Sequence, residues 1–144
     1  MPELEERFAD ALHSTARAWR QAVDRRLKGL GLSQAGWMTI AVAAKARAPL
    51  SQSELADRLG VEGATMVAMV DRLVKAGLVA RQPSKTDRRI NHVMLTEAGV
   101  RLYDRVKTEA AAVRRELLTE IDPKKLAIAA ELLEGLQGRI ERTP

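Results

Sequence analysis

The sequence contains no cysteine, few aromatic residues and no long apolar run, and each absence narrows what the chain can do. Without cysteine there is no disulfide, no thiolate metal site and no thiol catalysis or redox sensing. Aromatic residues make up 3% of the chain and apolar residues 46%, so Leu, Val and Ala must form the core, which favours packed helices. No apolar stretch approaches the roughly 20 residues that span a bilayer. Residues 1–6 are too acidic for a signal peptide, so we expect a cytoplasmic protein without a membrane segment.

Length and charge are compatible with a small nucleic-acid-binding protein but do not establish one. The 144 residues suit one domain with an added dimerisation element, and 24 Lys and Arg against 19 Asp and Glu would favour a polyanionic partner. His13 and His92 have no His or Cys partner at ligand spacing, so we expect no metal and no other cofactor. No nucleophile with a base and no glycine-rich phosphate loop is present, which indicates that the chain is not an enzyme.

Apolar residues recur at spacings of three and four through the first third of the chain, which predicts two helices. The first covers residues 4–27 with one apolar stripe. The second begins after an N-cap at Ser33 and stops before Pro49, because proline cannot continue a helix.

A short helix and a longer one follow, separated by a glycine turn. Ser51 and Glu54 have the spacing of a capping box, in which each side chain hydrogen-bonds the other residue's backbone, so a third helix should run to about residue 59. Gly60 breaks it, and a fourth helix is expected over residues 62–76. The pattern predicts an apolar face for this helix at Val67, Val70, Leu73 and Val74.

The period then changes from helical to alternating. Residues 78–82 read as a strand, residues 83–88 as a turn and residues 89–95 as the returning strand. Asp87 would repel a polyanion if it were free, and we expect it to hold a neighbouring arginine instead. The hairpin is otherwise basic, with Arg81, Lys85, Arg88 and Arg89.

The last third of the sequence predicts two more helices. Thr96 caps the first, and Asp122 followed by Pro123 begins the second. We expect a dimer through the terminal helices, since Leu4 and Phe8 of the first helix would expose an apolar face to solvent in a monomer. The last helix carries a short heptad seam at Leu126, Ala129, Leu133, Leu136 and Ile140.

Residues 51–95 are typical of a winged helix-turn-helix. Ala56, Gly60 and Met66 stand where such a pair needs a small residue, a turn glycine and an apolar plug. The second helix of the pair would enter the major groove, and the hairpin would be the wing. We therefore expect a mainly α fold with a small β wing: a dimerisation helix over 1–32, the DNA-binding domain over 33–100 and C-terminal dimerisation helices over 101–144.

Several motifs together identify a family resemblance that covers nearly the full length. They include Ala18-Trp19-Arg20, Val70-Asp71-Arg72-Leu73, Asp87-Arg88-Arg89 and Leu95-Thr96. The chain resembles the MarR family, and its SlyA-like branch in particular. The resemblance implies a homodimer with two winged helices that read a pseudo-palindrome in double-stranded DNA.

The resemblance also implies which residues face DNA. The recognition helix would present Gly63, Ala64, Thr65, Met66, Ala68, Met69 and Arg72, the preceding helix Ser51, Gln52 and Ser53, and the wing Ser84, Lys85, Arg88 and Arg89. The family commonly has arginine or another polar residue where this chain has Ala68. Alanine cannot make the bidentate guanine contact of an arginine. We therefore expect few base-specific contacts, with binding that depends more on phosphate contacts and on DNA shape.

Many members of this family respond to small phenolic or aromatic carboxylate ligands. A tryptophan face with an arginine would suit such an anion, although both tryptophans also lie on apolar stripes and would fill a core equally well. Gly36 stands where the SlyA-like pattern has histidine. The residues that would hold the ligand are Arg17, Trp19, Arg20 and Trp37.

The sequence thus predicts a sequence-specific DNA-binding regulator, a repressor that a small aromatic anion releases. The alternative is an architectural dimer that binds DNA without sequence preference and has no ligand. Ala68 keeps that alternative open.

Overall fold

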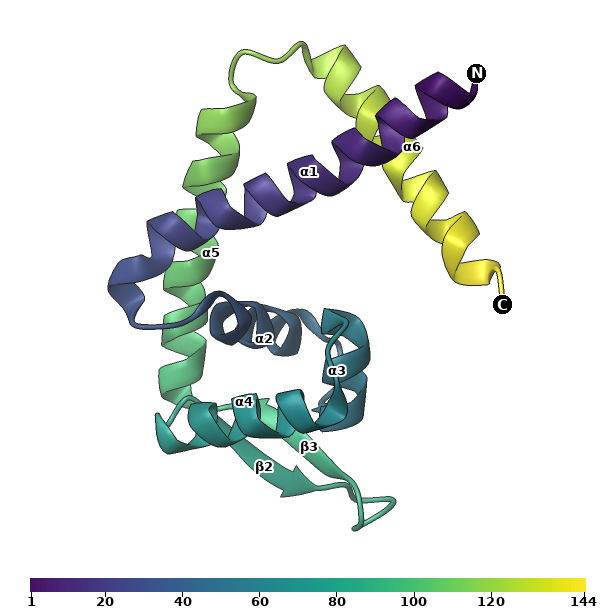
Figure 1. Cartoon of the computed structure of the whole chain (residues 1–144). Coiled ribbons are helices and arrows are strands. Elements are labelled where there is room, and N and C mark those ends of the chain that lie inside the picture. The colour runs from purple at the N-terminus through teal and green to yellow at the C-terminus, as the bar shows by residue number, and fades with distance from the viewer. The chain divides into compact units, whose positions relative to one another are not determined.

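The computed structural model describes residues 1–144 and is mostly helical with one small sheet (Figure 1). The helices are α1 (Pro2–Leu27), α2 (Gln34–Lys45), α3 (Gln52–Leu59), α4 (Gly63–Lys75), α5 (Glu97–Leu118) and α6 (Pro123–Arg142), and a 3-10 turn, η1 (Lys28–Leu30), follows α1. The strands are β1 (Leu50–Ser51), β2 (Val79–Pro83) and β3 (Asn91–Leu95). No helix combines the length and the apolar character needed to cross a membrane. The chain forms two compact units, residues 1–113 and 114–144.

Side-chain caps begin the helices where the sequence predicts them. The Ser33 Oγ accepts a hydrogen bond from the Gly36 N–H at 3.1 Å and starts α2. At α3 both bonds of the capping box are present: the Ser51 N–H donates to Glu54 and the Glu54 N–H donates to Ser51 Oγ, each at 3.1 Å. The first of these bonds lowers the pKa of Glu54, because it stabilises the carboxylate.

The sheet has three antiparallel strands in the order β1-β3-β2. The β2–β3 hairpin matches the prediction, with Val79 opposite Leu95 and Pro83 opposite Asn91. Strand β1 was not predicted, since two residues are too few for an alternating pattern to appear. It pairs Leu50 with Val93. Because β1 leads directly into the N-cap of α3, this pairing connects the wing to the start of α3.

The main core lies between α2, α3, α4 and the sheet, around Ile40, Leu55 and Val93. The predicted buried face of α4 is partly wrong. Val70 and Leu73 are buried as expected, but Val67 and Val74 are 41% and 38% exposed. Apolar residues lie on more than one side of α4, so spacing alone could not decide the face. The buried positions are Met66, Met69, Val70 and Leu73.

A second buried cluster joins α1, α2 and α5. It contains Val23, Leu27, Trp37, Val106 and Val113. The Trp37 indole N–H donates to Asp24 Oδ1 at 3.0 Å. This bond satisfies the polar edge of a buried aromatic ring and attaches α1 to α2.

The start of α5 is fastened to the end of α4. The Thr96 hydroxyl donates to the Gly77 carbonyl at 2.6 Å and accepts from the Gly99 N–H at 3.1 Å. A Cβ on Gly99 would lie 2.1 Å from the Leu78 carbonyl oxygen, so only glycine permits this approach.

The second unit, residues 114–144, has little core of its own. Helix α6 contains no buried residue. Its exposed large apolar residues are Leu126, Ile128, Leu132, Leu133 and Ile140. Leu126, Leu133 and Ile140 belong to the seam that the sequence predicts, and Ile128 and Leu132 widen the apolar face beyond it.

Candidate nucleic-acid interface

Helices α3 and α4 form a tight pair whose turn depends on one glycine. Gly60 adopts the left-handed conformation with φ of 67°, which a side chain rarely tolerates, and its N–H donates to the Ala56 carbonyl. Ala56 and Met66 are buried between the helices. The expected small residue, turn glycine and apolar plug are therefore present.

The buried face of α4 fixes which of its residues are presented outward. Opposite the core, at spacings of four and three, lie Ala64, Ala68, Asp71 and Lys75, all exposed. Gly63, Thr65 and Arg72 are exposed as well. Met66 and Met69 are only 2% and 8% exposed, so the expectation that they face DNA is wrong: both belong to the core.

Two of the expected serines have structural tasks. Ser51 is buried and its hydroxyl caps α3. Ser84 is buried, and its Oγ accepts from the N–H groups of Thr86 and Asp87 at 3.2 and 3.3 Å. Both hydroxyls therefore accept backbone hydrogen bonds within the protein, and their expected contact with DNA stays a prediction. Ser53 is exposed, and Gln52 is half-buried.

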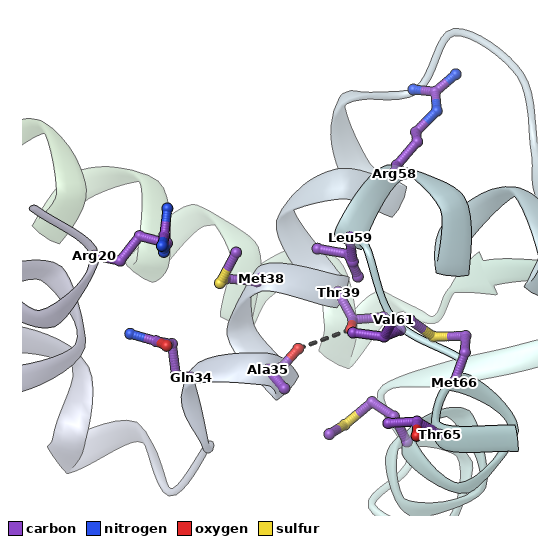
Figure 2. Close-up of a pocket in the computed structure, with 11 residues that line it drawn as sticks. Arg20, Gln34, Ala35, Met38, Thr39, Arg58, Leu59, Val61, Thr65 and Met66 are labelled. Carbon is purple, nitrogen blue, oxygen red and sulfur yellow. Dashed lines mark hydrogen bonds between the residues drawn. The ribbon is translucent and has the colours of Figure 1, made fainter. Parts of the chain in front are cut away.

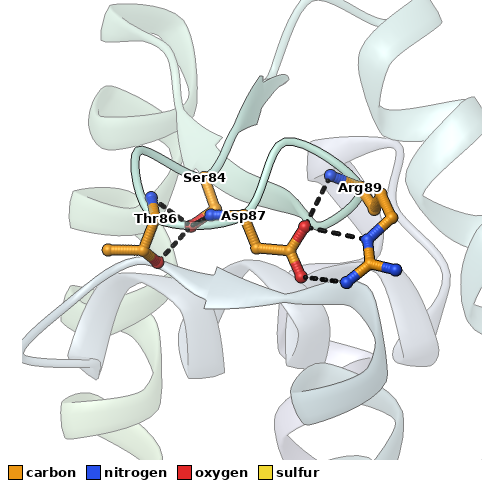
Figure 3. A network of polar contacts seen from close by, with 4 residues as sticks. All are labelled: Ser84, Thr86, Asp87 and Arg89. Atoms are coloured by element: carbon orange, nitrogen blue, oxygen red, sulfur yellow. Dashed lines mark hydrogen bonds and ion pairs between the residues drawn. The ribbon is translucent and has the colours of Figure 1, made fainter.

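The wing tip is an organised turn that holds one arginine (Figure 3). Asp87 Oδ1 accepts from the Arg89 backbone N–H and from its Nε, both at 3.1 Å, and Asp87 Oδ2 accepts from the guanidinium at 3.2 Å. These bonds, chiefly those from the side chain, lower the pKa of Asp87. The Arg89 side chain remains 90% exposed. The prediction that Asp87 holds a neighbouring arginine is confirmed, and the arginine is Arg89.

The two other cations of the wing tip, Lys85 and Arg88, are exposed and form no ion pair. Residues 51–101 carry eight Lys and Arg against six acids, a small excess. The positive charge available to a polyanion is therefore concentrated at the wing and not spread over the domain.

A network that sequence reasoning missed connects the wing to both helices. Arg81 on β2 donates from Nε to Gln52 Oε1 at 2.7 Å and from its guanidinium to Asp71 Oδ1 at 2.6 Å. A longer bond of 3.4 Å reaches the Val67 carbonyl. The partners lie 10, 14 and 29 residues away in sequence, so no local spacing could have revealed them.

A cavity of about 480 Å³ lies behind the recognition helix (Figure 2). Arg20 and Arg58 stand at opposite ends of the group drawn there, and no acidic residue lines the space. The Thr39 hydroxyl donates to the Ala35 carbonyl at 2.7 Å. The lining comprises Arg20, Gln34, Ala35, Met38, Thr39, Arg58, Leu59, Val61, Thr65, Met66 and Met69.

The cavity contains one of the four residues expected to hold a ligand. Arg20 lines it, but Arg17, Trp19 and Trp37 do not. Trp37 is buried, with its indole N–H bound to Asp24, and Trp19 packs against the same cluster. Trp37 is thus a core residue and Trp19 is partly buried against the same cluster, and a tryptophan face for a ligand stays a prediction. No group of three or more His, Cys, Asp or Glu is placed to hold a metal ion.

Comparisons with known proteins agree with this geometry. Residues 30–90 match the family model described as MarR family. The crystal structure of the transcriptional regulator PA3341 is 40% identical, with 93% of this chain and 98% of that one covered and a TM-score of 0.86. BldR from Sulfolobus solfataricus is 25% identical over 99% of this chain and 98% of its own, with a TM-score of 0.81.

A third structure shares the fold at lower identity. CouR from Rhodococcus jostii RHA1, crystallised with p-coumaroyl-CoA, is 24% identical over 92% of this chain and 93% of its own, with a TM-score of 0.78. The full-length match at 40% identity, the family model and the helix pair with its basic wing lead to one conclusion. The chain belongs to the MarR family of transcriptional regulators and has their winged-helix DNA-binding fold.

Proposed function

We propose that this protein is a cytoplasmic homodimer of the SlyA-like branch that represses transcription by occupying a pseudo-palindromic operator in double-stranded DNA. The observation that carries the proposal is the organised wing, whose Arg89 is 90% exposed beside two unpaired cations, Lys85 and Arg88. An exposed arginine on an organised turn suits the narrow minor groove of A·T-rich DNA, where the potential is most negative.

The remaining exposed residues have separate tasks in this proposal. Helix α4 lies in the major groove, where the Thr65 hydroxyl meets a base edge or a thymine methyl and Arg72 lies at the edge of the contact. Ser53 and the free amide N–H groups of Gln52 contact phosphates, as do Lys85 and Arg88. Such contacts set the register of the protein on DNA and carry little sequence information.

The direct test compares two duplexes of equal length at equal salt: a fragment from upstream of the protein's own gene and a random sequence. Fluorescence anisotropy should show a preference of about 10³ or more for the upstream fragment, and footprinting should show two protected half-sites.

Equal affinity for both duplexes would instead support the second candidate function, an architectural dimer without sequence preference. The outward face of α4 favours that candidate, since Ala64 and Ala68 offer no hydrogen bond to a base.

The apolar face of α6 supports the homodimer. A helix of 20 residues with no buried position would expose this face to water unless another chain covers it. Leu133→Asp with Leu136→Asp should give a monomer or an unfolded chain in analytical ultracentrifugation. The control, Glu131→Asp with Glu134→Asp, changes the opposite face and should remain dimeric. A wild-type monomer at micromolar concentration would overturn the proposal.

The cavity behind α4 supports release by a small aromatic carboxylate or phenolic ligand. Its volume suits a small molecule, and two arginines without a lining acid favour an anion. Three methionine side chains give an adaptable apolar wall that accepts an aromatic ring: Met38, Met66 and Met69. Because Thr65, Met66 and Met69 belong to α4, an occupant would press on the helix that enters DNA.

Calorimetry with salicylate-like anions tests this site. Arg20→Gln should weaken binding, while Arg17→Gln, on the same helix but outside the lining, should not. Linkage requires the ligand to weaken DNA binding by the factor by which DNA weakens ligand binding. No saturable binding across a panel of aromatic acids would overturn this part of the proposal.

A further inference from the structure

The recognition helix carries an acid on the face it turns outward. Asp71 stands in line with Ala64, Ala68 and Lys75, and its side chain is 60% exposed. A free carboxylate there would repel the phosphate backbone as α4 approaches DNA. An acid on this face therefore requires a partner if the helix is to bind.

Arg81 supplies that partner from the wing strand. Its guanidinium lies 2.6 Å from Asp71 Oδ1, the shortest of its contacts, while its Nε is held by Gln52 at 2.7 Å. The side chain is only 26% exposed, although it belongs to the basic hairpin. The planar guanidinium donates to α3 and α4 at once, which a lysine ammonium at one point could not reproduce.

We infer that Arg81 is a positioning residue for DNA binding: it neutralises Asp71 on the reading face of α4 and fixes α3, α4 and the wing as one body. Arg81 makes no DNA contact of its own in this inference. The inference rests on the proposed DNA binding, and it assigns to Arg81 a role different from that of Lys85, Arg88 and Arg89.

The test is a double-mutant cycle in DNA affinity, measured on the full-length protein with the upstream fragment. Arg81→Gln should weaken binding by about tenfold or more, because it exposes the Asp71 charge. Asp71→Asn alone should bind DNA as tightly as wild type or more tightly. In the double variant, Asp71→Asn should restore affinity to within about threefold of Asp71→Asn alone.

Salt dependence separates this role from a direct phosphate contact. If Arg81 touched a phosphate, its removal would flatten the log–log salt slope by about 0.9 and Asp71→Asn would not restore affinity. Arg101→Gln, which removes one exposed cation from α5, controls for net charge and should leave affinity nearly unchanged. Thermal unfolding followed by circular dichroism reports whether each variant is folded.

Three results would overturn the inference: Arg81→Gln binding DNA as wild type does, a double variant no better than Arg81→Gln, or Asp71→Asn weakening binding. The Asp71→Asn result can be used even if Arg81→Gln does not fold, because Asp71 is an exposed side chain and its substitution should leave the fold intact. Failure of the wild-type protein to bind DNA would instead overturn the proposed function itself.

Discussion

The recognition helix and the wing differ in what they would present to DNA. Helix α4 turns Ala64, Ala68, Lys75 and the ion-paired Asp71 outward, and its other face contributes four residues to the core. The wing buries Val79 and Val93 in the core, and its tip presents Lys85, Arg88 and Arg89 on a turn that Ser84 and Asp87 organise. In the proposed complex with DNA, α4 therefore fits the groove mainly by shape, and the wing supplies most of the net positive charge.

This difference explains how a domain with little excess charge could bind DNA. A few cations at the end of a hairpin reach phosphates and a narrow groove more effectively than the same charges spread over a surface. It also implies that sequence preference depends on DNA shape in the flanks as much as on base edges under α4.

Removing the wing cations should have the largest effect. Arg88→Ala with Arg89→Ala should weaken operator binding by about 2 kcal/mol or more, since one groove arginine contributes roughly 1–3 kcal/mol. The log–log salt slope should flatten by about 0.9 for each phosphate that the variant no longer binds. The control Arg101→Ala with Arg105→Ala removes two exposed cations from α5. Unchanged affinity and slope in the wing variant would refute the role of the wing.

Adding a cation to the outward face of α4 should bring the positive charge of this helix closer to that of the wing. Ala68→Arg should steepen the salt slope by about 0.9 for one new phosphate contact. Where a guanine lies within reach, it should improve discrimination by roughly 1–3 kcal/mol. Gln21→Arg adds the same charge on α1 as a control. If Ala68→Arg behaved as Gln21→Arg does, position 68 would not face DNA.

Disturbing the organisation of the wing should have a smaller effect than removing its charges. Ser84→Ala deprives two backbone N–H groups of their acceptor and should lower the free energy of unfolding by about 1 kcal/mol. DNA affinity should fall less than in the double arginine variant, because the cations remain. Chemical denaturation and anisotropy measure both, with Ser14→Ala on α1 as the control. A Ser84→Ala protein as stable as the control would contradict the assigned role.

Titration of Asp87 should give the smallest effect near neutral pH. Its pKa is lowered by Arg89, so the pair is intact above the ordinary value of 3.8 and is lost as pH falls through the lower folded value. Because the pair stays intact between about pH 6 and 8, titration of Asp87 should cause no pH dependence of DNA binding in that range. NMR should place the Asp87 midpoint below 3.8, and Arg89→Ala should raise it. A wild-type midpoint at or above 3.8 would contradict the pairing.

Local sequence signals predicted the elements that depend on neighbouring residues. The caps at Ser33 and Ser51, the glycine turn at Gly60 and the β2–β3 hairpin arise from residues a few positions apart. The heptad spacing on α6 identified an apolar face, whose dimer contact stays a prediction.

Features that depend on distant contacts could not be predicted in this way. Strand β1 exists only because β3 pairs with it, and Arg81 meets Gln52 across 29 positions. The face of α4 was partly misassigned because Met66 and Val67 both continue an apolar row, and only tertiary packing buries the first and exposes the second. Packing also places Trp37 in a buried cluster, and it forms a cavity beside Arg20 that the sequence did not predict.

Selection of binding sites from a random duplex pool by the purified protein tests the central claim most directly. The account predicts an enriched pseudo-palindrome whose preference lies largely in A·T-rich flanks beneath the wings, with weaker base preference beneath α4. Arg89→Ala should remove the preference in the flanks and leave the centre of each half-site unchanged. Strong base preference under α4 with no preference in the flanks would contradict the account.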